Sequence, residues 1–186
     1  MYKIMLADDE GIVIDSLKFI IEKEFKDICE VQYAKTGRSV IELAESFRPD
    51  IAVMDIQMPG INGIDAMKEK ETVWVPTLVT TGNLLGCGRY PQEELEKIFD
   101  SARANVSCAW EKGVLLAAGS DAGAYRVLHG QGLLDEYQIF CDLFGETEEL
   151  KNRLKEGESV IRRKFQAEKV WKLTSKSTII DAASAS

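Results

Sequence analysis

The sequence predicts an α/β protein in which five parallel strands form one doubly wound sheet, with helices on both faces and an additional helix after the sheet. Three observations support this prediction. Short apolar segments alternate with amphipathic segments, the connections between them are short, and several apolar segments end in acidic residues. Alternation of this kind indicates parallel strands joined by right-handed helical crossovers.

The composition is that of a globular protein with a real core. The chain has 186 residues, of which 45% are apolar and 29% charged. A net charge of -8 and a pI of about 4.9 argue against direct nucleic-acid binding, because modules that bind nucleic acids are usually basic. The acidity fits a cytoplasmic protein, or one with a cation site.

Cysteine and histidine usage argues against a zinc site. Four cysteines, Cys29, Cys87, Cys108 and Cys141, form no Cys-x-x-Cys pair, and His129 is the only histidine. We therefore expect buried, reduced thiols in a cytosolic protein. The sequence contains no signal peptide and no run of about 20 apolar residues, so we expect no membrane association.

The first predicted strand covers residues 2–7 and ends in three adjacent acids, Asp8, Asp9 and Glu10. Carboxylates this close repel one another unless a cation lies beside them. A helix follows, because apolar residues recur at helical spacing at Ile14, Leu17, Ile21 and Phe25.

The second predicted strand covers residues 30–34, and the next helix carries apolar residues from Val40 to Phe47. Either Thr36 or Ser39 is placed to cap that helix.

The third predicted strand, residues 51–54, is apolar and therefore expected to be buried. Asp55 follows directly at the C-terminal end of this strand, where a turn with Pro59 begins. Asp is a common turn residue, so Asp55 alone could simply cap this turn. If the first strand lies beside the third, however, Asp8, Asp9 and Asp55 converge at the edge where open α/β sheets bind ligands. Carboxylates grouped in this way suit Mg²⁺, which prefers oxygen ligands.

Residues 1–70 resemble the receiver domain of bacterial response regulators, which has a flavodoxin-like fold. Asp8 and Asp9 match the metal-binding acids of that family, and Asp55 matches its phosphoacceptor. The loop after Asp55 has the family's residues at Pro59, Gly60 and Gly63. The resemblance implies that a histidine kinase donates a phosphoryl group to Asp55, and that Mg²⁺ neutralises the charge that develops during transfer. It also implies a signalling role rather than an enzyme.

A fourth strand is predicted over residues 73–82 and a fifth, expected to be buried on both faces, over residues 114–120. Receivers carry a Thr or Ser at the end of the fourth strand, and Thr81 is the best candidate, with Thr80 next. A hydroxyl there could bond a phosphoryl oxygen, although Thr is also simply a good strand residue. A helix from Pro91 to Lys112 is expected between the two strands.

The end of the fifth strand departs from the receiver pattern. Receivers have a Lys there, whereas this chain has Ser120 and Asp121. Lys112 precedes the strand and so belongs to the opposite edge of the sheet. An acid in place of the Lys should favour Mg²⁺, with Asp121 as a further candidate ligand, and disfavour a phosphoryl dianion.

Residues 73–145 resemble the last two βα units of amidohydrolase-family (β/α)₈ barrels. The similarity rests on the motifs Val-Pro-Thr-Leu at 75–78, Gly-Val-Leu-Leu-Ala-Ala-Gly-Ser-Asp-Ala-Gly at 113–123 and Val-Leu-His-Gly at 127–130. In that family the Asp at the position of Asp121 assists a metal-bound water. The His-x-His motif and the further histidine ligands of that family are absent, so hydrolase chemistry lacks its metal ligands. His129 is the only histidine in the sequence, and we expect it to be a loop or surface residue near a helix start.

The two resemblances together suggest a chimera joined near residue 70, with five strands in the order 2-1-3-4-5. The predicted organisation is a receiver-like domain over residues 1–145, composed of a receiver half (1–70) and a barrel-like half (71–145). A helical extension over 146–173 and a loose, Ser-, Thr- and Ala-rich tail over 174–186 follow.

The extension carries only a thin apolar stripe, so it either packs over the sheet or mediates a homodimer. Its basic cluster, Arg162, Arg163 and Lys164, is expected to be a solvated face. The leading functional hypothesis is a Mg²⁺-dependent phosphoacceptor in two-component signalling, impaired by the missing Lys. The alternatives are an engineered fold chimera without native activity and, less favoured, a metal-dependent amidohydrolase remnant.

Overall fold

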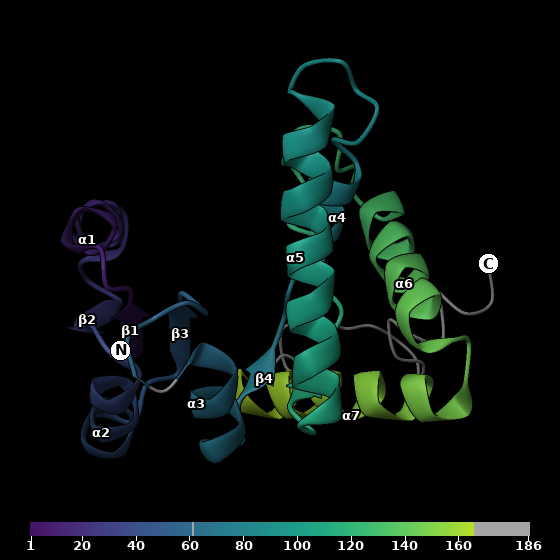
Figure 1. Ribbon diagram of the computed structural model, residues 1–186. Coiled ribbons are helices and arrows are strands. Elements are labelled where there is room, and N and C mark those ends of the chain that lie inside the picture. Colours follow the sequence, from purple (N-terminus) through teal and green to yellow (C-terminus); the bar gives the residue numbers. More distant parts are fainter. Residues whose placement is uncertain (61, 166–186) are drawn as a thin grey trace. The chain divides into compact units, whose positions relative to one another are not determined.

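The structure of the protein, a computed structural model, describes residues 1–60 and 62–165. The chain divides into two compact units, Met1–Thr72 (unit 1) and Val73–Ser186 (unit 2). Unit 1 holds a parallel sheet with three helices, and the described part of unit 2 holds two short strands and four helices (Figure 1).

The sheet of unit 1 consists of β1 (Tyr2–Ala7), β2 (Cys29–Ala34) and β3 (Ile51–Met54), in the order β2-β1-β3. All pairs are parallel, and β1 pairs with β2 from Tyr2 opposite Cys29 to Ala7 opposite Ala34. The predicted placement of the first strand between the second and the third is therefore confirmed.

Helices cover both faces of this sheet. Helix α1 (Gly11–Phe25) lies on one side, and α2 (Gly37–Phe47) and α3 (Gly63–Glu69) lie on the other (Figure 1). Successive side chains of a strand point to opposite faces. The apolar cluster on the α2 and α3 side accordingly contains alternate strand residues and helix residues, namely Met5, Ala7, Ala34, Val40, Met58 and Ala66.

The start of α2 shows why the helix begins where it does. The hydroxyl of Thr36 accepts a hydrogen bond from the backbone N–H of Ser39 (3.2 Å), and the hydroxyl of Ser39 accepts one from the N–H of Thr36 (3.1 Å). This reciprocal capping box satisfies two N–H groups that a helix start would leave unpaired. Both candidate capping residues from the sequence are thus used.

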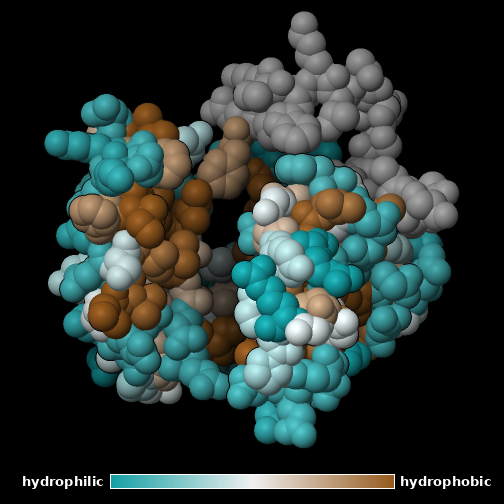
Figure 2. Space-filling view, turned by 90° about the horizontal axis from the view of Figure 1, so that it is seen from above, coloured by the Kyte–Doolittle hydropathy of each residue, from teal (hydrophilic) through white to brown (hydrophobic). Residues whose placement is uncertain are grey.

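The prediction that the third strand is buried is wrong. Ile51 and Val53 are 41% and 45% exposed. The reason is that β3 is the edge strand of a sheet that stops there, so its side chains have a neighbouring strand on one side only. Ile12, Phe19 and Ile20 of α1 are exposed as well. Apolar side chains are visible on the surface of unit 1 (Figure 2).

Unit 2 contains β4 (Val73–Trp74), α4 (Val79–Gly82), α5 (Gln92–Glu111), β5 (Leu115–Leu116), α6 (Gln131–Phe144) and α7 (Glu148–Lys164). The helix expected from Pro91 to Lys112 is confirmed by α5. A helix is present within the predicted extension as α7, up to Lys164. Residues 166–186, which hold the rest of that extension and the tail, lie outside the described residues.

The predicted fourth strand is wrong beyond Trp74. Pro76 has no N–H to donate to a sheet, and Thr77 adopts a left-handed φ of 53° that turns the chain. The following residues form α4, and the N–H groups of Leu78 and Val79 are bound by a side chain of α6 rather than by a strand. The strong β-propensity of the Val- and Thr-rich segment is therefore overridden by its tertiary surroundings.

The fifth strand is shorter than predicted, covering Leu115–Leu116, although Val114, Leu116 and Ala117 are buried as expected. It pairs in parallel with β4, Val73 opposite Leu115 and Trp74 opposite Leu116. The described strands thus form a three-stranded and a two-stranded sheet. The single five-stranded order 2-1-3-4-5 is not what the structure shows.

Helix α7 is part of the core of unit 2. Leu150 and Leu154 are fully buried with Leu116, Val106 and Phe140. None of the helices within residues 1–60 and 62–165 is both long and apolar enough to cross a membrane.

Candidate metal and phosphoacceptor site

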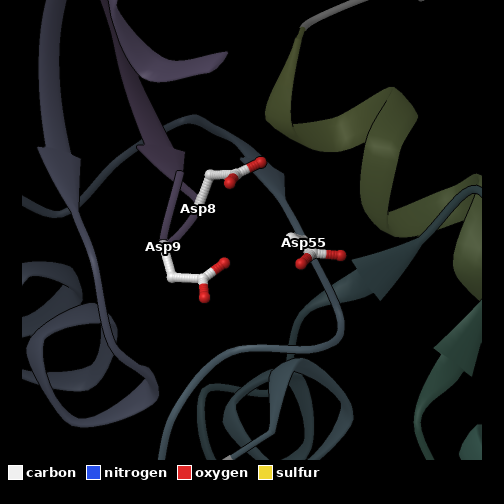
Figure 3. A group of neighbouring side chains, drawn as sticks. All are labelled: Asp8, Asp9 and Asp55. Carbon is white, nitrogen blue, oxygen red and sulfur yellow. The ribbon is translucent and has the colours of Figure 1, made fainter. Parts of the chain in front are cut away.

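Two strand ends in unit 1 bring three carboxylates together. Asp8 and Asp9 follow β1 directly, and Asp55 follows β3. Ala7 lies opposite Met54, and the N–H of Asp55 donates to the carbonyl of Ala7 (2.8 Å), so the two strands end at the same level. One oxygen from each carboxylate lies within 4.8 Å of the other two (Figure 3). The convergence expected from the sequence is present.

Local hydrogen bonds hold the turn that carries the acids. Asp8 Oδ1 accepts a hydrogen bond from the backbone N–H of Glu10 (2.8 Å), which fixes the chain between β1 and α1. On the other strand, the N–H of Gly63 donates to the carbonyl of Ile56 (3.0 Å), so the loop after Asp55 folds back against its own beginning. Asn62 then caps α3 by accepting from the N–H of Asp65 (3.0 Å).

The donor set fits Mg²⁺. This ion takes oxygen ligands at about 2.1 Å in octahedral geometry, which places neighbouring ligand oxygens about 3 Å and opposite ones about 4 Å apart. Oxygens within 4.8 Å of one another therefore need only small side-chain rotations to share one ion. Asp8 and Asp55 are half-buried and Asp9 is exposed, so the site is open to water, which Mg²⁺ retains as ligand.

Gly63 is required by close backbone packing. A Cβ at this position would lie 2.8 Å from the carbonyl oxygen of Asp55 and 2.9 Å from the Cα of Ile56. Neither atom belongs to a side chain that could rotate away.

We therefore expect Gly63→Ala to displace the segment that carries Asp55, to weaken Mg²⁺ binding about tenfold and to destabilise unit 1 by about 1–3 kcal/mol. Isothermal titration calorimetry with Mg²⁺ and urea unfolding followed by circular dichroism measure the two effects. The control is Lys68→Ala, an exposed change on the same helix. Equal Mg²⁺ affinity in both variants would contradict the packing argument.

The other predicted site residues lie in unit 2. Thr80 and Thr81 are in α4 rather than at a strand end, and the hydroxyl of Thr80 donates to the carbonyl of Thr77 (2.8 Å). Asp121 lies in an exposed turn after β5 with a left-handed φ of 49°, and its assignment as a ligand stays a prediction. His129 is exposed in the loop before α6, as expected of a surface histidine.

Sequence reasoning missed two charged residues. Lys35 follows β2 directly, at the same end of the sheet as the acids, and only its position after a strand could have revealed it. Glu136 of α6 is fully buried, and it lies at helical spacing from Leu133, three residues before it, and Phe140, four residues after it. An acid among apolar helix positions was the available signal.

Comparison with known proteins supports a receiver domain in the N-terminal part of the chain. Residues 4–84 match the family model described as response regulator receiver domain. Protein-glutamate methylesterase/protein-glutamine glutaminase 2 of Methanospirillum hungatei is 36% identical over 115 residues, covering 60% of this chain and 30% of the relative. The uncharacterized transcriptional regulatory protein YesN of Bacillus subtilis is 37% identical over 73 residues, covering 39% of this chain and 20% of that protein.

Among solved structures, the response regulator domain of Thermotoga maritima CheB matches with a TM-score of 0.39 and 20% identity, covering 77% of this chain and 93% of that one. The chain spans 30% and 20% of the length of the two curated relatives above. Residues 4–84 are thus similar to response regulator receiver domains. The family match ends at residue 84, and the amidohydrolase resemblance and the chimera stay predictions.

Proposed function

We propose that the protein is a phosphoacceptor module of two-component signalling, in which Asp55 receives a phosphoryl group with the help of Mg²⁺. The observation that carries this proposal is the group of three carboxylates at the ends of β1 and β3, within a segment that matches receiver domains. In this role the protein is a signalling component rather than an enzyme, and a histidine kinase is its phosphodonor.

Each acid has a separate task in the proposed reaction. An oxygen of Asp55 attacks the phosphorus in line with the bond to the donor; the new P–O bond forms as the donor takes the electron pair of the old bond. Asp8 and Asp9, together with Asp55, would hold Mg²⁺, which supplies positive charge to the phosphoryl oxygens. Exposure of Asp9 leaves the site accessible to a donor protein.

Transfer is proposed to be weaker than in a typical receiver, because the fifth strand is followed by Ser120 and Asp121 rather than by a Lys. Thr81 remains the candidate for a hydroxyl that bonds the phosphoryl group, and Thr81→Ala would test that role. A homodimer through α7 is a further part of the proposal that sedimentation velocity can test.

Incubation with acetyl phosphate and Mg²⁺ is expected to add one phosphoryl group to the protein, and Asp55→Asn is expected to abolish this gain. An amide cannot act as the nucleophile, whereas the fold should be kept. Intact-mass spectrometry measures the gain, and circular dichroism confirms folding.

The matched control is Asp15→Asn, an exposed acid on α1 that should leave labelling unchanged. Labelling that persists in Asp55→Asn would show that the acceptor is another residue. A folded wild-type protein that gains no mass would contradict the proposal and favour the alternative, a chimera without native activity.

A further inference from the structure

The end of β2 places a lysine beside the acidic site. Ala34, the last residue of β2, lies opposite Ala7, and the N–H of Asp8 donates to the carbonyl of Ala34 (3.2 Å). Lys35 therefore leaves β2 directly beside the turn formed by Asp8 and Asp9.

The side chain of Lys35 points toward the start of α1. Ala7 and Ala34 both pack in the cluster on the α2 and α3 side, so the residue after each of them faces the other side of the sheet. The Nζ atom of Lys35 lies 3.3 Å from the position of a Cβ on Gly11, the first residue of α1. Gly11 has no side chain, which leaves room for the ammonium group over the segment that follows Asp9.

The charge balance of the site needs such a group. Three carboxylates and one divalent cation leave a net charge of about -1, and a phosphoryl group on Asp55 makes the site more negative. Lys35 is exposed and has no carboxylate within 4 Å among residues 1–60 and 62–165, so its ammonium group is not committed to an ion pair there. A lysine is a mobile point charge on a flexible stem and can follow an anion over a few ångströms.

We propose that Lys35 is the anion-binding residue of this site, and that its Nζ provides the positive charge for the phosphoryl group carried by Asp55. The proposal rests on the proposed function of the acidic cluster. It places at the end of β2 the positive charge that receivers carry on a Lys after the fifth strand, where this chain has Ser120 and Asp121.

The test compares Lys35→Ala, Lys35→Arg and Lys26→Ala, which removes one positive charge at the other end of α1. Calorimetric titration measures binding of Mg²⁺ alone and then of beryllofluoride, a phosphoryl analogue, to the Mg²⁺-loaded protein. Lys35→Ala should weaken beryllofluoride binding about three- to tenfold and tighten Mg²⁺ binding about two- to fivefold, because the lysine attracts the anion and repels the cation. Lys35→Arg should resemble wild type, and Lys26→Ala should change neither affinity more than about twofold.

Opposite signs for the two ligands distinguish this role from a structural one, since a damaged site would bind both ligands more weakly. Weakening of both, or equal effects of Lys35→Ala and Lys26→Ala, overturns the proposal. A wild-type protein that binds Mg²⁺ but is never phosphorylated contradicts the proposed function instead. In that case Lys35→Ala must still tighten Mg²⁺ binding for the assignment of Lys35 to stand.

Discussion

Replacement of Gly157 by alanine is expected to destabilise unit 2 by about 3–5 kcal/mol, although Gly157 lies inside a helix. A Cβ at this position would lie 2.1 Å from the carbonyl oxygen of Leu116 and 2.8 Å from its carbonyl carbon. Both atoms belong to the backbone of β5 and cannot rotate away. Helix α7 would have to move off the strand, and the fully buried side chains of Leu150 and Leu154 would lose contacts with it.

The sign of this effect separates packing from helix propensity. Propensity alone predicts that Gly→Ala in a helix interior stabilises by about 1 kcal/mol. Urea unfolding followed by tryptophan fluorescence reports on unit 2, because all three tryptophans, at positions 74, 110 and 171, belong to it. The control Ser159→Ala, at an exposed position of α7, should stabilise by a few tenths of a kcal/mol. A Gly157→Ala protein as stable as wild type would show that α7 does not pack on β5 as described.

A second contact explains why α7 cannot be treated as a loose appendage. The guanidinium of Arg153 lies 3.5 Å from the centre of the Trp110 ring, and it donates hydrogen bonds to the carbonyls of Trp110 (3.1 Å) and Val114 (3.3 Å). Trp110 in turn stacks on Phe144 with 4.4 Å between ring centres. One face of the indole is thus covered by α7 and the other by α6. Burial in this position lowers the pKa of Arg153, but the group stays charged.

The sequence predicted helices better than strands, and the reason is physical. Helical periodicity in α1, α2 and α5 is a local property of the chain and survives whatever the helix packs against. The extent of a strand depends on its neighbours: Val79, Thr80 and Thr81 have strand-forming side chains, yet they form α4 because α6 supplies partners for the N–H groups at its start.

The same contrast between local sequence patterns and long-range packing applies to the acidic site and to Glu136. Asp8, Asp9 and Asp55 were predictable because a carboxylate directly after an apolar strand is a pattern in one stretch of sequence. Lys35 follows a strand too, but its relation to the acids arises only from the register of β2 against β1. Burial of Glu136 arises only from the packing of α6 against α4. Neither the position of Lys35 beside the acids nor the burial of Glu136 can be predicted from a local sequence pattern.

Glu136 is a titratable group with a large expected influence on the pH dependence of unit 2. Its side chain is fully buried, and its two carboxylate oxygens accept hydrogen bonds from the N–H groups of Leu78 (3.1 Å) and Val79 (2.7 Å). Burial raises the pKa of Glu136 from 4.5 to about 7, and the hydrogen bonds from Val79, Leu78 and Thr77 lower it only in part. The folded protein therefore binds this proton more tightly than the unfolded chain does.

The direction of the pH effect follows from this difference. The contribution of Glu136 is most favourable below the unfolded pKa of 4.5, where both states are protonated, and it is lost as the pH rises through the folded pKa of about 7. The shift corresponds to about 3 kcal/mol. Wild type should therefore lose stability relative to Glu136→Gln by about 2–3 kcal/mol between about pH 5 and about pH 8, since the amide does not titrate.

Urea unfolding followed by tryptophan fluorescence measures the free energy of unfolding of both proteins at each pH in this range. The exposed acids titrate alike in the two proteins, so their contribution cancels when one free energy is subtracted from the other. At about pH 5 Glu136→Gln should be less stable than wild type by about 1–3 kcal/mol, because its NH₂ group faces an N–H of α4 in place of an acceptor. This deficit should shrink or reverse towards pH 8, where wild type has lost the contribution of the protonated carboxyl. Glu111→Gln, an exposed change on α5, should keep the pH profile of wild type. Parallel profiles of wild type and Glu136→Gln would show that the buried carboxyl has the same proton affinity in the folded and unfolded chains. The hydrogen bonds to α4 would then fully offset the cost of burying the charge.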